Sequence, residues 1–229
     1  MNLYELSFTS YIYSNFTNFD ETYLNFLDNI NNDINLFNPS HRKHLLKWLN
    51  NWGCRNFYKK CHELASNEIL SWYKEYNNNL PPKETNMWEL KQDQLKLIQT
   101  TYDDLKLKVA SHILKDGRDI KKSIGETGSA KILFSLRPKS LIPWDIAMRY
   151  YYAKNYSIST YSEFLLKVID EIRELKESCQ KENFELCDIP SLLNKENMTI
   201  PKFIDEDHWI RITNGFILPD NNVLKNWLK

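Results

Sequence analysis

Residues 124–149 read Ile-Gly-Glu-Thr-Gly-Ser-Ala-Lys-Ile-Leu-Phe-Ser-Leu-Arg-Pro-Lys-Ser-Leu-Ile-Pro-Trp-Asp-Ile-Ala-Met-Arg, and this stretch decides the expected fold. Two of the five glycines in the chain, Gly125 and Gly128, predict a turn that leads into a helix, and Pro138 ends that helix. Asp145 follows a second proline and precedes Ile-Ala-Met, which is the sequence context of a helix N-cap. The predicted order is a glycine turn, a helix, a proline break and a second, capped helix.

Apolar residues recur at the helical spacing through most of the remaining chain. The helices predicted in this way cover residues 20–36, 40–52, 56–76, 87–114, 118–123, 159–180, 188–196 and 221–228. A strand pair at 209–218 is the only β structure expected, and residues 205–208, Asp-Glu-Asp-His, are expected to form an acidic surface loop. With only 5 Gly and 8 Pro among 229 residues, the composition also disfavours a many-turned β fold. The predicted fold class is therefore all-α.

Charge is distributed unevenly along a chain whose formal net charge is zero. Residues 41–62 carry six Lys and Arg and no acid, residues 115–149 carry eight bases against four acids, and residues 160–210 carry twelve acids against six bases. Affinity for a polyanion would have to come from the two basic segments. The first also contains aromatic residues, which either stack on bases beside neutralised phosphates or belong to the core.

The remaining composition argues against several classes of protein. The four cysteines are few and irregularly spaced, which predicts a reducing compartment and no disulfide framework. We find no signal peptide and no apolar run of the length that a membrane span needs, so we expect a cytoplasmic protein without membrane contact. No phosphate-binding loop or dinucleotide fingerprint occurs, and no zinc pattern is complete. We therefore expect neither a metal nor a cofactor.

A glycine turn before a helix leaves backbone N–H groups free at the helix start, where the helix dipole also favours a phosphate. The simpler alternatives are an ordinary corner between two helices, and a purely capping role for Asp145. The candidate DNA-binding residues around the turn are Lys121, Lys122, Gly125, Thr127, Gly128, Ser129, Lys131 and Arg149.

Taken together, the two halves of the stretch resemble the helix-hairpin-helix DNA glycosylase superfamily. Residues 124–128, Ile-Gly-Glu-Thr-Gly, take the place of the family's Leu-Pro-Gly-Val-Gly hairpin, although the first glycine comes one position earlier. Trp144-Asp145 takes the place of the family's Val-Asp pair, at a shorter interval than usual, and Arg149 follows at the family's spacing. The resemblance implies two helical lobes around a cleft, with Asp145 as the catalytic residue.

The resemblance also implies a division of the chain and a reaction. The implied parts are an N-terminal helical lobe at 1–85, a helix-hairpin-helix core at 86–155, and C-terminal helices at 156–229 that pack back on the first lobe. Ala130 stands where members with lyase activity have a lysine, and Lys131 is one residue away, so a monofunctional enzyme is implied. A fixed carboxylate near C1′ would stabilise the positive charge that develops on the sugar and would activate water.

The substrate would be double-stranded DNA with a damaged or modified base, which must be flipped out of the stack before it can react. Trp52, Arg55 and Trp144 are candidates for lining the base pocket or wedging into the stack. Residues 44–55 also resemble, more distantly, bacterial anti-phage glycosylases that excise glucosylated hydroxymethylcytosine. We expect a monomer. Two other readings stay open: a non-catalytic DNA-binding protein that uses only the hairpin, and a helical protein-interaction module.

Overall fold

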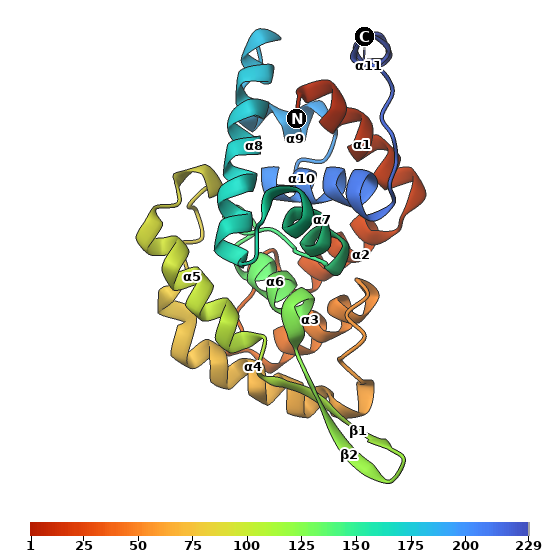
Figure 1. The fold of residues 1–229 in the computed structure, drawn as a ribbon. Coiled ribbons are helices and arrows are strands. Elements are labelled where there is room, and N and C mark those ends of the chain that lie inside the picture. Colours follow the sequence, from red (N-terminus) through yellow and green to blue (C-terminus); the bar gives the residue numbers. More distant parts are fainter. Residues whose placement is uncertain (229) are drawn as a thin grey trace.

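Helices make up most of the computed structural model, which describes residues 1–228 (Figure 1). The α-helices in this part of the chain are α1 (Leu3–Phe16), α2 (Phe19–Asn29), α3 (Pro39–Asn51), α4 (His62–Tyr76), α5 (Gln92–Leu105), α6 (Gly125–Leu136), α7 (Ile146–Tyr156), α8 (Tyr161–Lys181), α9 (Ile189–Leu192), α10 (Ile200–His208) and α11 (Asn221–Leu228). The predicted all-α class is therefore confirmed in its coarse form, with one small sheet as the exception. Within residues 1–228, no helix has both the length and the apolar character required to cross a membrane.

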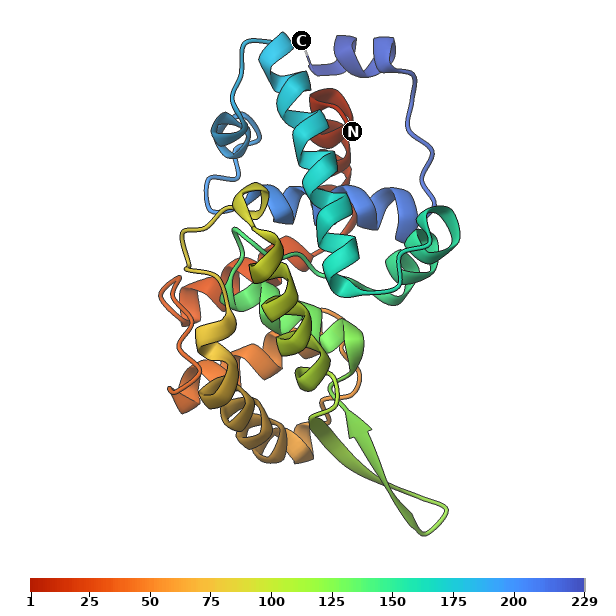
Figure 2. The ribbon, with the colours of Figure 1, turned by 60° about the vertical axis from the view of Figure 1, so that its left-hand side comes forward.

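That sheet is an antiparallel hairpin of β1 (Val109–Lys115) and β2 (Arg118–Ser123), which projects from the helical body in both views (Figures 1 and 2). The helix predicted at 118–123 is therefore wrong, and the one predicted over 87–114 ends at Leu105. Asp116 and Gly117 form the two-residue loop, and their φ angles are 52° and 72°. An Asp-Gly pair with two positive φ angles favours a hairpin over a helix. The glycine turn consequently follows a strand.

The region after α10 also differs from the prediction. Instead of a strand pair at 209–218, residues Trp209–Thr213 form a π-helical turn that continues α10. The N–H of Asn214 donates to the carbonyl of Trp209 at 3.0 Å and closes that turn. The expected surface loop at 205–208 is wrong as well, because these residues form the last turn of α10 and are buried. Thr199, Ile200 and Pro201 begin this helix, and a proline in the first turn is a common start signal.

The helices lie in two groups, and both views show them at opposite ends of the molecule (Figures 1 and 2). At one end α1 packs against α8, α10 and α11, so the two ends of the chain meet. At the other end α3 contacts α4 and α6, and α5 contacts α4 and α6. Helix α2 packs on α3, and α5 also packs on α8, which joins the groups.

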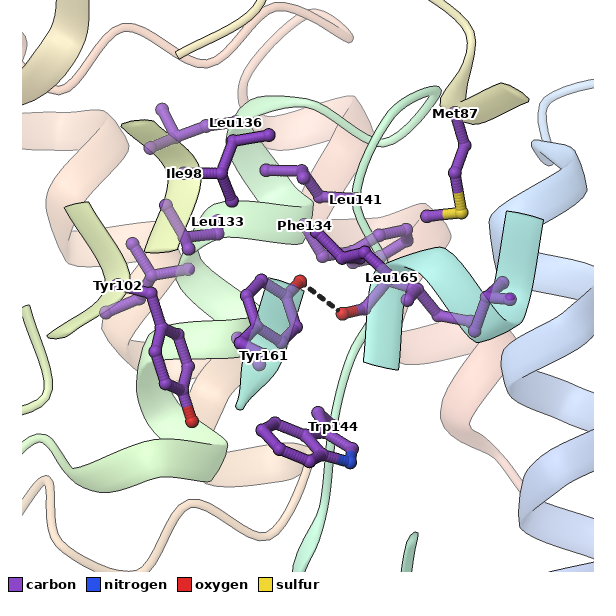
Figure 3. Packing of buried hydrophobic residues seen from close by; sticks show 14 of the residues in the cluster. Met87, Ile98, Tyr102, Leu133, Phe134, Leu136, Leu141, Trp144, Tyr161 and Leu165 are labelled. Carbon is purple, nitrogen blue, oxygen red and sulfur yellow. Dashed lines mark hydrogen bonds between the residues drawn. The ribbon is translucent and has the colours of Figure 1, made fainter. Parts of the chain in front are cut away.

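The apolar core runs through both groups and fixes the segment between α6 and α7. Figure 3 shows Leu133 and Phe134 of α6 beside Ile98 of α5 and Tyr161 of α8. The hydroxyl of Tyr161 donates to the carbonyl of Ile142 at 2.6 Å. This bond holds the segment that leads to Asp145, so the start of α7 is anchored to the core.

Candidate active site

A cavity of about 710 Å³ lies where the starts of α6 and α7 face the connection after α3 and the end of α10. Its lining comes from segments that are far apart in the sequence. The residues that line it are Tyr13, Phe19, Trp52, Gly53, Cys54, Arg55, Asn56, Ile124, Gly125, Glu126, Thr127, Gly128, Lys131, Pro143, Asp145, Ile146, Ala147, Arg149, Asp205, Trp209 and Thr213. The fold thus brings the glycine turn and Asp145 to one cavity.

The two glycines of the turn serve different purposes. Gly125 begins α6 with a φ of +75°, a conformation that costs glycine little. A Cβ on Gly128 would lie 3.0 Å from Cγ2 of Ile124 and 3.4 Å from Cε2 of Phe57, so this position is closely packed. No side chain caps the start of α6, and the first N–H groups of a helix have no acceptor inside it. The N–H of Gly125 donates to the carbonyl of Lys106 at 3.1 Å. The donors that the first turn of α6 can present at the cavity wall therefore come from the residues after Gly125.

Asp145 is the N-cap of α7, as the sequence predicts. Its Oδ1 accepts a hydrogen bond from the N–H of Met148 at 2.9 Å. Its Oδ2 accepts one from the hydroxyl of Thr213 at 3.1 Å. Because one oxygen is held by the helix and the other by the π-helical turn, the carboxylate has a fixed orientation at the cavity. The sequence did not reveal Thr213, which lies in a segment predicted to be a strand.

Arg149 links the two halves of the site. Its Nε lies 3.0 Å from a carboxylate oxygen of Glu126, and its Nη1 donates to the hydroxyl of Thr127 at 3.2 Å and to the carbonyl of Trp144 at 3.1 Å. Predicted as a DNA contact, the guanidinium is instead used inside the protein. It holds the start of α7 against the first turn of α6.

Three further predicted residues line the cavity, and they differ in how firmly the protein holds their side chains: Trp52, Lys131 and Arg55. The indole of Trp52 is only 5% exposed, and its N–H donates to the carbonyl of Phe19, so Trp52 is a fixed wall and not a mobile wedge. The ammonium of Lys131 donates to the carbonyl of Trp52 and lies 5.4 Å from the centre of its ring. The guanidinium of Arg55 is exposed and makes no hydrogen bond or ion pair within residues 1–228.

Four predicted residues do not line the cavity: Lys121, Lys122, Ser129 and Trp144. Lys121 and Lys122 lie on β2, opposite His112 and Ser111 of β1. Ser129 is buried, and its hydroxyl donates to the carbonyl of Gly125 at 2.9 Å.

Trp144 lies in the core, which corrects its assignment to the base pocket or wedge. It is 2% exposed, and its ring stacks on Phe164 at 5.1 Å with an angle of 7° between the planes. Figure 3 shows its indole beside Tyr161, among the core side chains. Burial of a large aromatic side chain in the core is strongly favourable, so Trp144 is withdrawn from the cavity, whereas its neighbours Pro143 and Asp145 line it.

Asp205 adds a third carboxyl group to the cavity lining, after those of Asp145 and Glu126, and it was not among the residues predicted from the sequence. Asp205 of α10 is 6% exposed, lines the cavity, and makes no hydrogen bond within residues 1–228. Burial raises its pKa to about 6, although Lys202 and Lys131 act to lower the pKa, and Asp145 adds to the increase. The helix start at Thr199-Ile200-Pro201 was the sequence signal that could have placed Asp205 on a helix.

Among residues 1–228, no group of three or more His, Cys, Asp and Glu side chains is arranged to hold a metal ion. Comparisons of the chain with protein-family models, with curated proteins and with solved structures give no match. The functional assignment therefore depends on the geometry of the cavity.

Proposed function

We propose that this protein is a monofunctional DNA glycosylase that hydrolyses the N-glycosidic bond of a flipped base and leaves an abasic site. One observation carries the proposal: the oriented carboxylate of Asp145 shares a cavity with the glycine turn at the start of α6. The substrate is a damaged or hypermodified base, such as glucosylated hydroxymethylcytosine in phage DNA. Duplex DNA is the proposed partner, and a cytoplasmic monomer is the proposed working form.

The proposed chemistry needs only groups that the chain supplies. Cleavage of the bond between sugar and base develops positive charge at C1′, which a nearby carboxylate stabilises. The same carboxylate of Asp145 can accept a proton from the attacking water. The free N–H groups in the first turn of α6 suit a backbone phosphate of the flipped nucleotide. Arg149 supports this arrangement by joining Glu126 and Thr127 to the start of α7.

The direct test replaces Asp145 with asparagine. Asparagine is as good an N-cap as aspartate, so Asp145→Asn should leave the free energy of unfolding nearly unchanged. Base release should fall about 10²- to 10⁴-fold, which is the usual contribution of a general base. The assay scores alkali-labile abasic sites in duplexes with single defined lesions and in phage DNA with modified cytosines.

The matched control is Asp170→Asn, which changes an exposed carboxyl group on α8 outside the cavity. This control should release base at the wild-type rate. A wild-type rate in Asp145→Asn would contradict the catalytic role of Asp145. Salt-dependent DNA binding without base release from any substrate would instead favour a non-catalytic DNA-binding protein.

The monofunctional assignment makes a separate prediction about lysine. Ala130 is fully buried, and the ammonium of the neighbouring Lys131 already donates to the carbonyl of Trp52. We therefore expect no covalent adduct when the protein is mixed with an abasic duplex and sodium borohydride, which reduces a Schiff base. A trapped complex that disappears in Lys131→Ala would show that Lys131 acts as a nucleophile and would overturn this part of the proposal.

A further inference from the structure

The β1–β2 hairpin carries cationic side chains that the cavity does not use. Arg118, Lys121 and Lys122 lie on β2, where the first two are exposed and Lys122 is half-buried. None of the three forms a hydrogen bond or an ion pair through its side chain with the side chains that the structure describes. The hairpin projects from the helical body in both views (Figures 1 and 2), so these cations face solvent and not the core.

A second basic segment lies beside the hairpin. The connection between α3 and α4 contains Arg55, Lys59 and Lys60, all exposed, and no acid. The 3-10 turn at the end of this connection packs on β1, and the thiol of Cys61 donates to the carbonyl of His112 at 3.5 Å. At the other end of the connection, Arg55 lines the cavity. The basic connection therefore runs from the cavity to the middle of β1.

Together these residues form what we call the basic strip: Arg55, Lys59, Lys60, Arg118, Lys121 and Lys122. The acids of the hairpin itself are Asp116 in its loop and Asp119, whose Oδ2 lies 2.8 Å from Nδ1 of His112. The acidic segment 160–210 supplies α8 and α10, which lie at the opposite end of the molecule in both views. A protein without net charge is thus polarised, and its hairpin end is the one that attracts a polyanion.

The base of the hairpin is fixed to the wall of the cavity. The side-chain amide of Asn56, which lines the cavity, donates to the carbonyl of Ser123 at 2.9 Å. The N–H of Ile124 donates to the carbonyl of Lys108 at 2.8 Å. Because β2 ends at Ser123 and α6 begins at Gly125, the basic strip and the glycine turn belong to one framework.

The hairpin is long enough to reach beyond a nucleotide held in the cavity. Its first strand has 7 residues and so spans about 23 Å at about 3.3 Å per residue. Each strand of a DNA duplex carries a phosphate about every 3.4 Å along the axis. Cations that extend over this length can therefore contact phosphates several base pairs from the flipped nucleotide.

We propose that the basic strip binds the phosphate backbones of duplex DNA beside the flipped nucleotide, with the hairpin in the major groove. This inference rests on the proposed glycosylase function and adds a DNA-binding surface outside the cavity. Side chains alternate along a strand, so Lys121 projects from one face of the hairpin, and Arg118 and Lys122 from the other. The major groove admits a two-stranded ribbon and has a phosphate backbone on either side, whereas a single strand has only one. Cations on both faces therefore match a duplex.

Binding to an unmodified duplex tests the basic strip without base release. The hairpin variant combines Arg118→Ala, Lys121→Ala and Lys122→Ala. Each lost phosphate contact lowers the slope of the logarithm of affinity against that of salt concentration by about 0.9, so this slope should decrease by about 2 to 3. Affinity at physiological salt should fall at least about tenfold. Fluorescence anisotropy across a salt series measures both.

The matched control makes the same change in net charge elsewhere. It combines Lys96→Ala on α5 with Lys176→Ala and Lys181→Ala on α8, which are exposed residues outside the cavity and the basic strip. The control should bind the duplex with the wild-type affinity and slope. Urea unfolding should give the same midpoint for the wild-type protein and both variants, which shows that lost binding is not lost folding.

Variants of single faces test the placement of the hairpin in a groove. Lys121→Ala alone should lower the slope by about 1, and Arg118→Ala with Lys122→Ala by about 2. A decrease from one face only would mean that the hairpin lies flat on the DNA, and the groove placement would be wrong. The wild-type protein should also bind the duplex several-fold more tightly than a single strand of the same length.

Several results would overturn the inference. These are a wild-type slope in the hairpin variant, an equal loss in the control, and tighter binding of the single strand than of the duplex. Binding to vesicles that contain phosphatidylserine, without binding to the duplex, would assign the basic strip to a membrane surface and would also overturn it.

These outcomes are distinct from failure of the proposed function. On a substrate that the wild-type protein cleaves, the hairpin variant should raise KM and leave kcat unchanged, because the basic strip touches no reacting atom. If the wild-type protein binds the duplex as expected but never releases a base, the glycosylase assignment is wrong and the DNA-binding role of the strip is supported. If the hairpin variant binds and releases bases like the wild-type protein, the glycosylase assignment stands and the inference is wrong. A wild-type protein that does not bind the duplex overturns both.

Discussion

Asp205 and Glu206 are adjacent on α10, and both are buried, but their surroundings are opposite. Glu206 has one oxygen 2.8 Å from the ammonium of Lys202 and the other 2.9 Å from that of Lys195. The hydroxyl of Ser10 also donates to it at 2.6 Å. Asp205 points to the cavity and has no such partner.

Lys202 and Glu206 form what we call the paired side of α10, where ion pairs hold this helix to its neighbours. Asp20 of α2 completes the network, because it also contacts Lys202 and Lys195, at 3.0 and 2.7 Å. Burial of Asp20 alone would raise its pKa, but the two lysines outweigh that effect and lower it to about 2. The pKa of Lys202 is raised well above its usual value, because Glu206, Tyr13 and Asp20 outweigh its burial. The comparison indicates that charge satisfied inside the protein serves the fold, whereas unsatisfied charge at the cavity is available to a ligand.

The largest effect should come from breaking the paired side. Lys202→Met leaves Glu206 and Asp20 with fewer cationic partners in the interior, and loss of one partner of a buried ion pair costs about 3–5 kcal/mol. Urea denaturation should show this loss of the free energy of unfolding. Adding Glu206→Gln should recover part of it, because the uncompensated charge is removed. A loss below about 1 kcal/mol would contradict the structural role of the network.

Asp205 forms the unpaired side of α10. Removing its charge should increase the free energy of unfolding, whereas removing the charge of Lys202 should lower it. The pKa of Asp205 in the folded protein, about 6, lies about two pKa units above the unfolded value, so folding is disfavoured once the group ionises. The wild-type protein should therefore lose stability as pH rises from about 4 to about 6. Asp205→Asn cannot ionise and should be more stable above pH 6, by on the order of 3 kcal/mol at about 1.4 kcal/mol per unit, with no gain at pH 4.

Thermal or urea unfolding at pH 4 and pH 8 measures this difference between the wild-type protein and Asp205→Asn. The exposed carboxyl of Asp170 offers a control, since Asp170→Asn should change stability little at either pH. If Asp205→Asn is destabilising at pH 8, Asp205 is part of the structural network after all.

The features of the site that depend on neighbouring residues in the sequence could be predicted, and those that depend on packing between helices could not. The capping role of Asp145 was readable because it depends on residues within one turn of helix. The hairpin was readable from Asp116-Gly117, but the basic residues after it were assigned to a helix. Asp205 and Thr213 reach the cavity only through packing of α10 against α1, which no local pattern encodes. Trp144 was misplaced for a similar reason, because aromatic residues of α5 and α8 bury it in the core.

The smallest effect should come from Arg55, a cation that, like Asp205, lines the cavity without a partner in the described part of the chain. Among the cationic residues that line the cavity within residues 1–228, Arg55 alone makes no hydrogen bond or ion pair, whereas Lys131 and Arg149 are both engaged. Arg55→Ala should leave the free energy of unfolding within about 0.5 kcal/mol of wild type. If Arg55 contacts a phosphate, DNA affinity should fall severalfold, and the slope of its logarithm against that of salt concentration should decrease by about 1. Fluorescence anisotropy across a salt series measures both, and Lys176→Ala, an exposed change on α8 outside the cavity and outside both basic segments, should leave the slope unchanged. An unchanged slope in Arg55→Ala would mean that an unpaired cation at this cavity is ordinary surface charge, and the comparison would then hold only for the carboxyl groups.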